Sequence, residues 1–243
     1  MLQVAIIGLG TLGIRMLEEL SQSGAETIVI DKDENIIQKY KDMAKYAFAT
    51  DVINAKALET VLPPELDAAI IDMGSNFEAT IMTTNNLHKL GIKKIIVEAD
   101  NDEQGEVLKL VGATQIVFPE EEAARRITPL LLTSVLHNFM PITADFALCE
   151  IDVSDELYGK KLTDSNLRNK WNLNVVAYRK SSSDDFSFIN SPNFEFKKDY
   201  TLLVAGQNED ISNYLTKFGS GTNLTNVSLI SRMFKKQYII RII

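Results

Sequence analysis

Short apolar runs alternate with segments of helical periodicity over the first half of the chain. The runs are rich in Val, Ile and Ala and are apolar on both faces, which is typical of strands buried between two helix layers. They cover residues 2–7, 27–31, 46–50, 67–72, 94–98 and 115–118. The helical segments between them cover residues 12–21, 34–41, 55–61, 77–90 and 103–111. This order predicts an α/β fold with a Rossmann-like, doubly wound parallel sheet.

The pattern changes after residue 119. Residues 120–140 have the apolar spacing of one more helix, which begins with three glutamates and ends at Pro141. Further strands are predicted at 146–153, 174–179, 186–189 and 200–205, helices at 163–170 and 209–218, and a hairpin turn at 181–185. The predicted organisation is a Rossmann-like domain (1–119), a connecting helix (120–141), a small α+β domain (142–218) and a tail (219–243).

Charge separates the tail from the rest of the chain. The net charge is −8, which argues against nucleic acid as a partner because non-specific binding to it needs a basic face. Residues 219–243 hold four basic and no acidic residues, so they carry +4 and leave −12 on the remainder. Basic and apolar residues together suit contact with a membrane surface or with a channel subunit. Such a segment more often packs against the core or in a dimer interface, and we expect the tail to pack between subunits.

Neither a membrane span nor a secretory signal is evident in the sequence. The most apolar window, residues 127–136, is interrupted by polar residues and Pro129, and it falls short of a bilayer crossing. The amino terminus lacks the basic region of a signal peptide, and Cys149 has no partner for an internal disulfide. We therefore expect a cytoplasmic protein.

A glycine fingerprint follows the first predicted strand directly. Gly8, Gly10 and Gly13 form a G-x-G-x-x-G turn that opens the first helix, and Asp31 ends the second strand. In a dinucleotide-binding unit the glycines admit a phosphate to the helix amino terminus, and the acid accepts the ribose hydroxyls. The alternative is a purely structural turn, with Asp31 capping the next helix.

Residues for catalysis are scarce in the chain. A dehydrogenase needs a group that moves a proton beside the hydride. The two histidines, His88 and His137, are expected to be surface or packing residues, and none of the seven tyrosines has a lysine four positions later. The sequence favours a domain that holds a nucleotide without transforming it, with an NAD-dependent dehydrogenase as the alternative.

The order of motifs resembles the RCK (regulator of potassium conductance) proteins of the Trk/Ktr potassium-uptake systems. The resemblance rests on residues 7–13, 29–33 and 50–52 and on the two-domain length, and it covers residues 1–218. It implies a first domain that binds ATP, ADP or NAD(H). It also implies homodimers, often assembled as an octameric ring, beneath an integral-membrane potassium transporter or channel subunit.

The same resemblance implies roles for individual residues. The glycines would hold the phosphates, Asp31 the ribose, and Asp51 the adenine. The complete set of nucleotide-binding positions would be Gly8, Gly10, Thr11, Leu12, Gly13, Asp31, Lys32, Asp51, Met73, Gly74 and Glu98. Glu120 matches a position associated with a divalent cation, for which a carboxylate suits Mg²⁺ or Ca²⁺. The alternative for Glu120 is a charge in the first turn of a helix.

Two positions depart from the family pattern. Thr11 stands where members that read a γ-phosphate often have arginine, and Glu98 stands where they often have a basic residue. A triphosphate would therefore lack its usual cationic partners. We hypothesise a less charged nucleotide, namely ADP, AMP or NAD, the alternative being a counter-charge from a metal or a neighbouring subunit.

The second domain matches the family's carboxy-terminal module, which in some members binds cyclic di-AMP at a dimer interface. Arg168, Asn174 and Val175 resemble that site, since arginine suits a phosphate and asparagine an adenine edge. The alternative is a helix-to-strand corner with a solvated Arg168. The resemblance thus implies a nucleotide-sensing regulatory subunit that gates a membrane potassium transporter or channel and lies at the inner face of the membrane through that partner.

Overall fold

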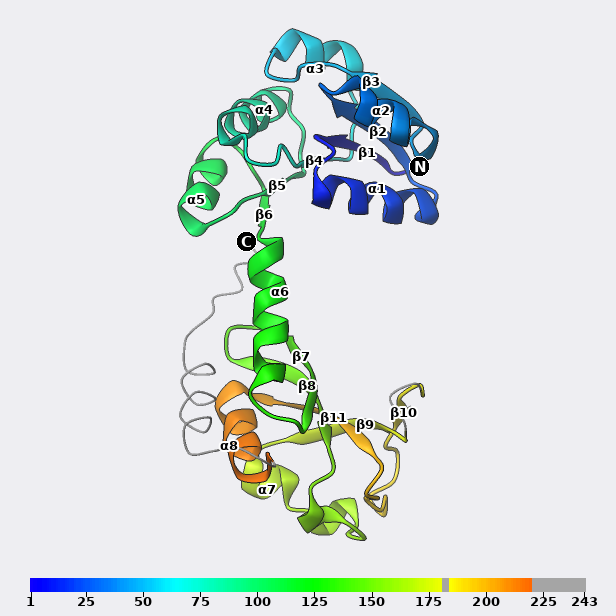
Figure 1. Ribbon diagram of the computed structural model, residues 1–243, viewed down its shortest axis with the longest axis vertical. Coiled ribbons are helices and arrows are strands. Elements are labelled where there is room, and N and C mark those ends of the chain that lie inside the picture. The colour runs from blue at the N-terminus through cyan, green and yellow to red at the C-terminus, as the bar shows by residue number, and fades with distance from the viewer. Residues whose placement is uncertain (181–183, 220–243) are drawn as a thin grey trace. The chain divides into compact units, whose positions relative to one another are not determined.

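The computed structural model describes residues 1–180 and 184–219, and the chain divides at Glu120/Glu121 into two compact units (Figure 1). The elements of the first unit are β1 (Gln3–Ile7), α1 (Thr11–Ser23), β2 (Glu26–Asp31), α2 (Glu34–Tyr40), a 3-10 turn η1 (Lys41–Met43), β3 (Tyr46–Ala49), α3 (Ala55–Val61), β4 (Ala68–Ile71), α4 (Phe77–Lys89), β5 (Ile95–Glu98), α5 (Asp102–Leu110) and β6 (Gln115–Val117). The predicted alternation of strands and helices is confirmed.

The first sheet is parallel throughout, in the order β3-β2-β1-β4-β5-β6. Alternate residues of β1 enter opposite cores: Ala5 and Ile7 pack in the layer of α3, α4 and α5, and Val4 and Ile6 in the layer of α1 and α2. Both faces are buried, which explains the continuous apolar runs in the sequence. The strand order reverses between β1 and β4, so ligands are expected at the carboxyl ends of these two strands.

The second unit is built on an antiparallel sheet. Its elements are α6 (Pro119–Ile127), which begins at the unit boundary, η2 (Thr128–Leu131), β7 (Leu136–Pro141), β8 (Phe146–Asp152), η3 (Asp155–Leu157), η4 (Leu162–Asp164), α7 (Leu167–Trp171), β9 (Asn174–Arg179), β10 (Ser187–Phe188), β11 (Thr201–Gln207) and α8 (Asn208–Phe218). The strand order is β10-β9-β11-β8-β7. The core of the second unit includes Phe196 and Tyr214, and α8 also contributes Ile211 and Leu215.

The predicted connecting helix over 120–141 is wrong. Helix α6 ends at Ile127, a 3-10 turn containing Pro129 follows, and residues from Leu136 onward form β7, which pairs with β8. The apolar residues that suggested a helix face have different surroundings, because Leu136 and Phe139 are buried against the sheet while Leu131 is 79% exposed. Pairing with β8 satisfies the backbone of this segment, and that gain outweighs its helical spacing.

Smaller differences occur elsewhere in the second unit. The helix predicted at 163–170 is the turn η4 followed by the short helix α7, and the strand predicted at 186–189 is reduced to β10. Residues 181–183 of the predicted hairpin turn and residues 220–243 of the tail lie outside the described residues. None of the helices in the described ranges has the length and apolar character that a bilayer crossing requires.

Candidate nucleotide-binding site

The glycine turn lies at the point where the strand order of the first sheet reverses. Gly8 follows β1 with φ of 83° and donates its N–H to Ile30 O at 2.8 Å. A Cβ atom on Gly8 would lie 1.8 Å from the backbone oxygen of Asp72. Only glycine accommodates both the left-handed backbone and this close approach to the residue that follows β4.

The first turn of α1 presents amide donors at this edge of the sheet. Gly10 is the N-cap and supplies no side chain to the helix terminus. The Gly13 N–H donates to Asp72 Oδ2 at 2.8 Å. The N–H groups of Thr11 and Leu12 have no acceptor among residues 1–180 and 184–219. Two donors at a positive helix end therefore remain open to an anion.

Asp31 lies beside the glycine turn, where a ribose-binding acid would be expected. Its Oδ2 accepts the Leu9 N–H at 2.8 Å and its Oδ1 accepts the Asp33 N–H at 2.9 Å. The cap of α2 is Asp33, whose carboxylate accepts the Asn35 N–H. The helix-capping alternative for Asp31 is therefore wrong, and its carboxylate instead ties the carboxyl end of β2 to the turn.

Asp72 is the residue that the sequence analysis missed. It follows β4, its side chain is only 2% exposed, and its Oδ1 accepts the Gly74 N–H at 3.2 Å. A Cβ on Gly10 would lie 2.3 to 2.5 Å from the carboxylate atoms, so this carboxylate rests directly against the turn. In the sequence, Asp72 could have been recognised as an acidic residue at the carboxyl end of the wholly apolar run that forms β4.

A group of carboxylates that includes Asp72 lies around Glu98. Burial raises the pKa of Glu98, at the end of β5, to about 7, with further contributions from the charge of Asp72, a hydrogen bond to it, and the charges of Glu120 and Asp100. Repulsion among like charges and partial desolvation both disfavour ionisation. At the position where the resemblance to the family leads us to expect a base, this chain thus has a carboxyl group whose pKa is raised well above its ordinary value.

This raised pKa predicts a pH-dependent contribution to stability. The folded chain favours protonated Glu98, so the contribution is full below pH 4.5 and is lost as the pH rises through about 7. We expect Glu98→Gln to raise the melting temperature relative to wild type more at pH 8 than at pH 5. Thermal unfolding at both values tests this, with Glu103→Gln on α5 as the control. An equal difference at the two pH values would contradict the assignment.

The remaining predicted positions lie around the same edge. Met73 and Gly74 follow Asp72, with the sulfur of Met73 3.1 Å from a Cβ built on Gly8. Lys32 and Asp51 are exposed, beyond the carboxyl ends of β2 and β3 respectively. Glu120 is exposed in the first turn of α6, and no cluster of three acidic, histidine or cysteine side chains within the described residues could hold a metal.

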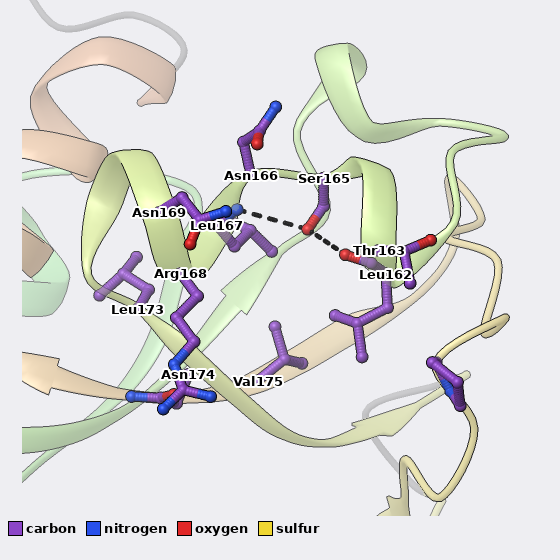
Figure 2. Close-up of a pocket in the computed structure, with 11 residues that line it drawn as sticks. Leu162, Thr163, Ser165, Asn166, Leu167, Arg168, Asn169, Leu173, Asn174 and Val175 are labelled. Atoms are coloured by element: carbon purple, nitrogen blue, oxygen red, sulfur yellow. Dashed lines mark hydrogen bonds between the residues drawn. The ribbon is translucent and has the colours of Figure 1, made fainter.

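The second candidate site is a cavity of about 350 Å³ in the second unit (Figure 2). Arg168, Asn174 and Val175 all line it, so the structure brings the three predicted residues together. Figure 2 shows the Arg168 side chain extending from α7 toward Asn174 at the start of β9. Its wall is completed by Leu162, Thr163, Ser165, Asn166, Leu167, Asn169, Leu173 and Pro192.

The corner beside this cavity has an unusual backbone. Asn166 and Asn172, on either side of α7, adopt left-handed conformations with φ of 53° and 51°. The Ser165 hydroxyl donates to Leu162 O at 2.7 Å and accepts the Leu167 N–H at 3.3 Å. Asparagine tolerates the left-handed conformation better than other non-glycine residues, and Asn172 is the C-cap of α7. These hydrogen bonds hold the corner in a defined shape, and Arg168 is exposed beside it.

Fold and site together define a two-domain protein, in which a Rossmann-like unit with a glycine turn is followed by a small α+β unit. Residues 4–119 match the TrkA-N domain and residues 148–219 the TrkA-C domain. The Bacillus subtilis Ktr system potassium uptake protein C is 30% identical over 212 residues, which cover 87% of this chain and 95% of that protein. The chain belongs to the family of Ktr system potassium uptake proteins.

Other relatives and solved structures agree in fold. The Vibrio alginolyticus Ktr system potassium uptake protein A is 25% identical over 215 residues, covering 88% of this chain and 96% of that protein. The GsuK RCK domain superposes with a TM-score of 0.63 at 13% identity, covering 97% of this chain and 53% of that chain. This chain thus spans about half the length of that structure.

Proposed function

We propose that this chain is a cytosolic, nucleotide-sensing regulatory subunit of a membrane potassium transporter or channel. The observation that carries the proposal is the glycine turn, with its open Thr11 and Leu12 amides, in a chain related over both units to a Ktr potassium uptake protein. The structure of a GsuK channel bound to NAD shares the fold of this chain, which supports a nucleotide as the ligand. The protein acts at the inner face of the membrane through its partner, as a homodimer or a larger ring.

Regulation follows from differential binding. A nucleotide held by α1 and Asp31 changes the balance between two arrangements of paired subunits only if its affinity differs between them. The membrane subunit then responds to the arrangement of the ring. Neither tight binding nor a conserved fold produces such a response without this difference.

The dehydrogenase alternative is not favoured by the positions of the histidines. His88 is in the last turn of α4, which leads to the amino end of β5 and so to the edge of the sheet opposite the glycine turn. His137 is on β7 of the second unit, where its Nε2 lies 2.7 Å from Asp152 Oδ1. The His88 imidazole is therefore not placed to move a proton at a nicotinamide held by the glycine turn, and the His137 imidazole is engaged with Asp152.

The regulatory role can be tested in vesicles. A Ktr-type membrane subunit reconstituted alone is expected to take up potassium poorly, and addition of this chain is expected to make uptake respond to added nucleotide. The measurement is the initial rate of potassium uptake with and without the chain. Uptake that is the same in both preparations, and indifferent to nucleotide, would refute the role.

The nucleotide itself is predicted to carry few charges. Thr11 and Glu98 provide no cation for a γ-phosphate, so we expect ADP, AMP or NAD(H) to bind more tightly than ATP. Isothermal titration of the full chain with each nucleotide, with and without Mg²⁺, measures the order. Clear selectivity for ATP in the absence of a divalent cation would contradict the prediction, while selectivity that appears only with Mg²⁺ would indicate a metal at Glu120.

The cavity beside α7 is proposed to bind cyclic di-AMP. Arg168 supplies a phosphate partner and Asn174 an adenine partner, and loss of one charged hydrogen bond costs about 1.5 to 3 kcal/mol. We expect Arg168→Gln to weaken binding by that amount in a titration. Lys170→Gln is the matched control, because Lys170 belongs to the same helix but lies over the Trp171 ring outside the cavity. Equal effects of the two variants would remove Arg168 from the site.

A further inference from the structure

The carboxylate of Asp72 lies against the glycine turn that would hold a phosphate. In a turn of this kind, the second glycine lets the phosphate approach the backbone, and amides of the following helix turn donate to it. Here the carboxylate of Asp72 lies 2.3 to 2.5 Å from the position that a Cβ on Gly10 would take, and its Oδ2 accepts the Gly13 N–H at 2.8 Å. The chain therefore supplies its own anion to the amino terminus of α1.

Among the backbone N–H groups in the first turn of α1, Asp72 accepts only that of Gly13. The Thr11 and Leu12 amides, one and two residues beyond the Gly10 cap, have no acceptor in the described part of the chain. An arriving phosphate could use these two donors, but it would lie beside the carboxylate of Asp72. Repulsion between neighbouring anions grows with each added phosphate charge and is strong in a partly desolvated site.

We propose that Asp72 determines the charge of the ligand at the glycine turn, so that the site selects adenosine and its monophosphate over the di- and triphosphate. The proposal rests on the proposed binding of an adenine nucleotide at this turn. Beyond that function, the proposal names Asp72 as the residue that sets the selectivity and narrows the ligand from an adenine nucleotide to adenosine or AMP. Full occupation of the helix terminus by a pyrophosphate requires Asp72 to give up its bond to Gly13.

A structural role for Asp72 makes a different prediction. Gly10 cannot cap α1 with a side chain, and Asp72 could serve as a cap contributed by a distant strand. Removal of such a cap would lower stability and would leave the relative affinities for different phosphates unchanged. Selectivity, rather than stability, therefore separates the two roles.

The test is equilibrium titration of the full chain with adenosine, AMP, ADP and ATP, in the absence of divalent cations. The variants are Asp72→Ala and Asp72→Asn, the latter keeping an oxygen that can accept the Gly13 N–H. For both we expect the affinity for ADP to rise at least roughly tenfold and that for ATP to rise further, with adenosine changed about threefold or less. Asp100→Asn, a control that removes an exposed charge of the same cluster, is expected to change ADP affinity about threefold or less.

Circular dichroism and thermal unfolding show which variants are folded, and Asp72→Asn serves if Asp72→Ala does not fold. A gain that is equal for adenosine and ADP, or a gain from Asp100→Asn as large as that from the Asp72 variants, overturns the proposal. So does the failure of folded variants and wild type to bind any of the four ligands. The regulatory function fails separately, in the vesicle uptake measurement, where the chain would have no effect on potassium transport.

Discussion

Gly8→Ala is expected to destabilise the first unit by at least about 3 kcal/mol. The left-handed backbone of Gly8, with φ of 83°, costs an alanine about 1 to 2 kcal/mol. The larger cost comes from the Cβ atom, which would lie 1.8 Å from the backbone oxygen of Asp72. That oxygen belongs to the main chain, so relief requires β1 and the end of β4 to separate, which breaks the bond from the Asp72 N–H to Ile7 O.

Gly24→Ala is the matched control for this prediction. Gly24 has nearly the same backbone, with φ of 77°, but a Cβ there would meet no atom within 4 Å. Only the conformational cost of about 1 to 2 kcal/mol remains. Hydrogen exchange of β1 and β4, followed by mass spectrometry, measures both variants in the unit concerned. Equal losses would mean that the close approach at Asp72 is relieved without cost.

Phe196→Ala is expected to cost the second unit about 3 to 5 kcal/mol. The side chain is 0% exposed and packs edge-on against Phe194 with ring centroids 5.3 Å apart. Its backbone N–H also donates to Lys160 O at 3.0 Å, which fixes the irregular segment between β10 and β11 to the loop before η4. Truncation leaves a cavity in the core of the second unit.

The chain contains a reporter for this second unit. Trp171 is its single tryptophan, and it contacts the Tyr214 ring edge-on at a centroid distance of 5.6 Å. Urea unfolding followed by tryptophan fluorescence therefore measures the unit that contains Phe196. Phe188→Ala is the control, because that ring is 72% exposed and its loss should change stability by less than about 0.5 kcal/mol. Similar losses for the two variants would contradict the assigned core.

Much of the first unit was predictable because its strands and its glycine turn depend on residues that are close together in the sequence. A strand buried on both faces must be apolar at every position, and β1 shows this with alternate residues in two separate cores. The turn after it must contain glycine wherever the backbone is left-handed or another main chain approaches. Gly8, Gly10 and Gly13 were therefore recognised from spacing alone, together with Asp31 at the end of the next strand.

The error at 120–141 shows where local rules stop. Leu130, Leu131, Val135 and Leu136 have helical spacing, yet Leu136 begins a strand because β8 offers its residues hydrogen-bonding partners. Pro129 interrupts the helix first by lacking an N–H. A short apolar segment carries too little information to choose between its own helix and a pairing with residues further along the chain.

By itself the sequence determined the class of fold, the glycine turn and the separation into two units, since these follow from patterns within a few turns or strands. Only the tertiary structure decided that the carboxylate of Asp72 lies against this glycine turn. Gly13 and Asp72 are 59 residues apart, and they meet because β4 pairs with β1 on the side opposite β2. The order of strands is a global property of packing, and it sets an acid, rather than a base, against the helix that would hold a phosphate.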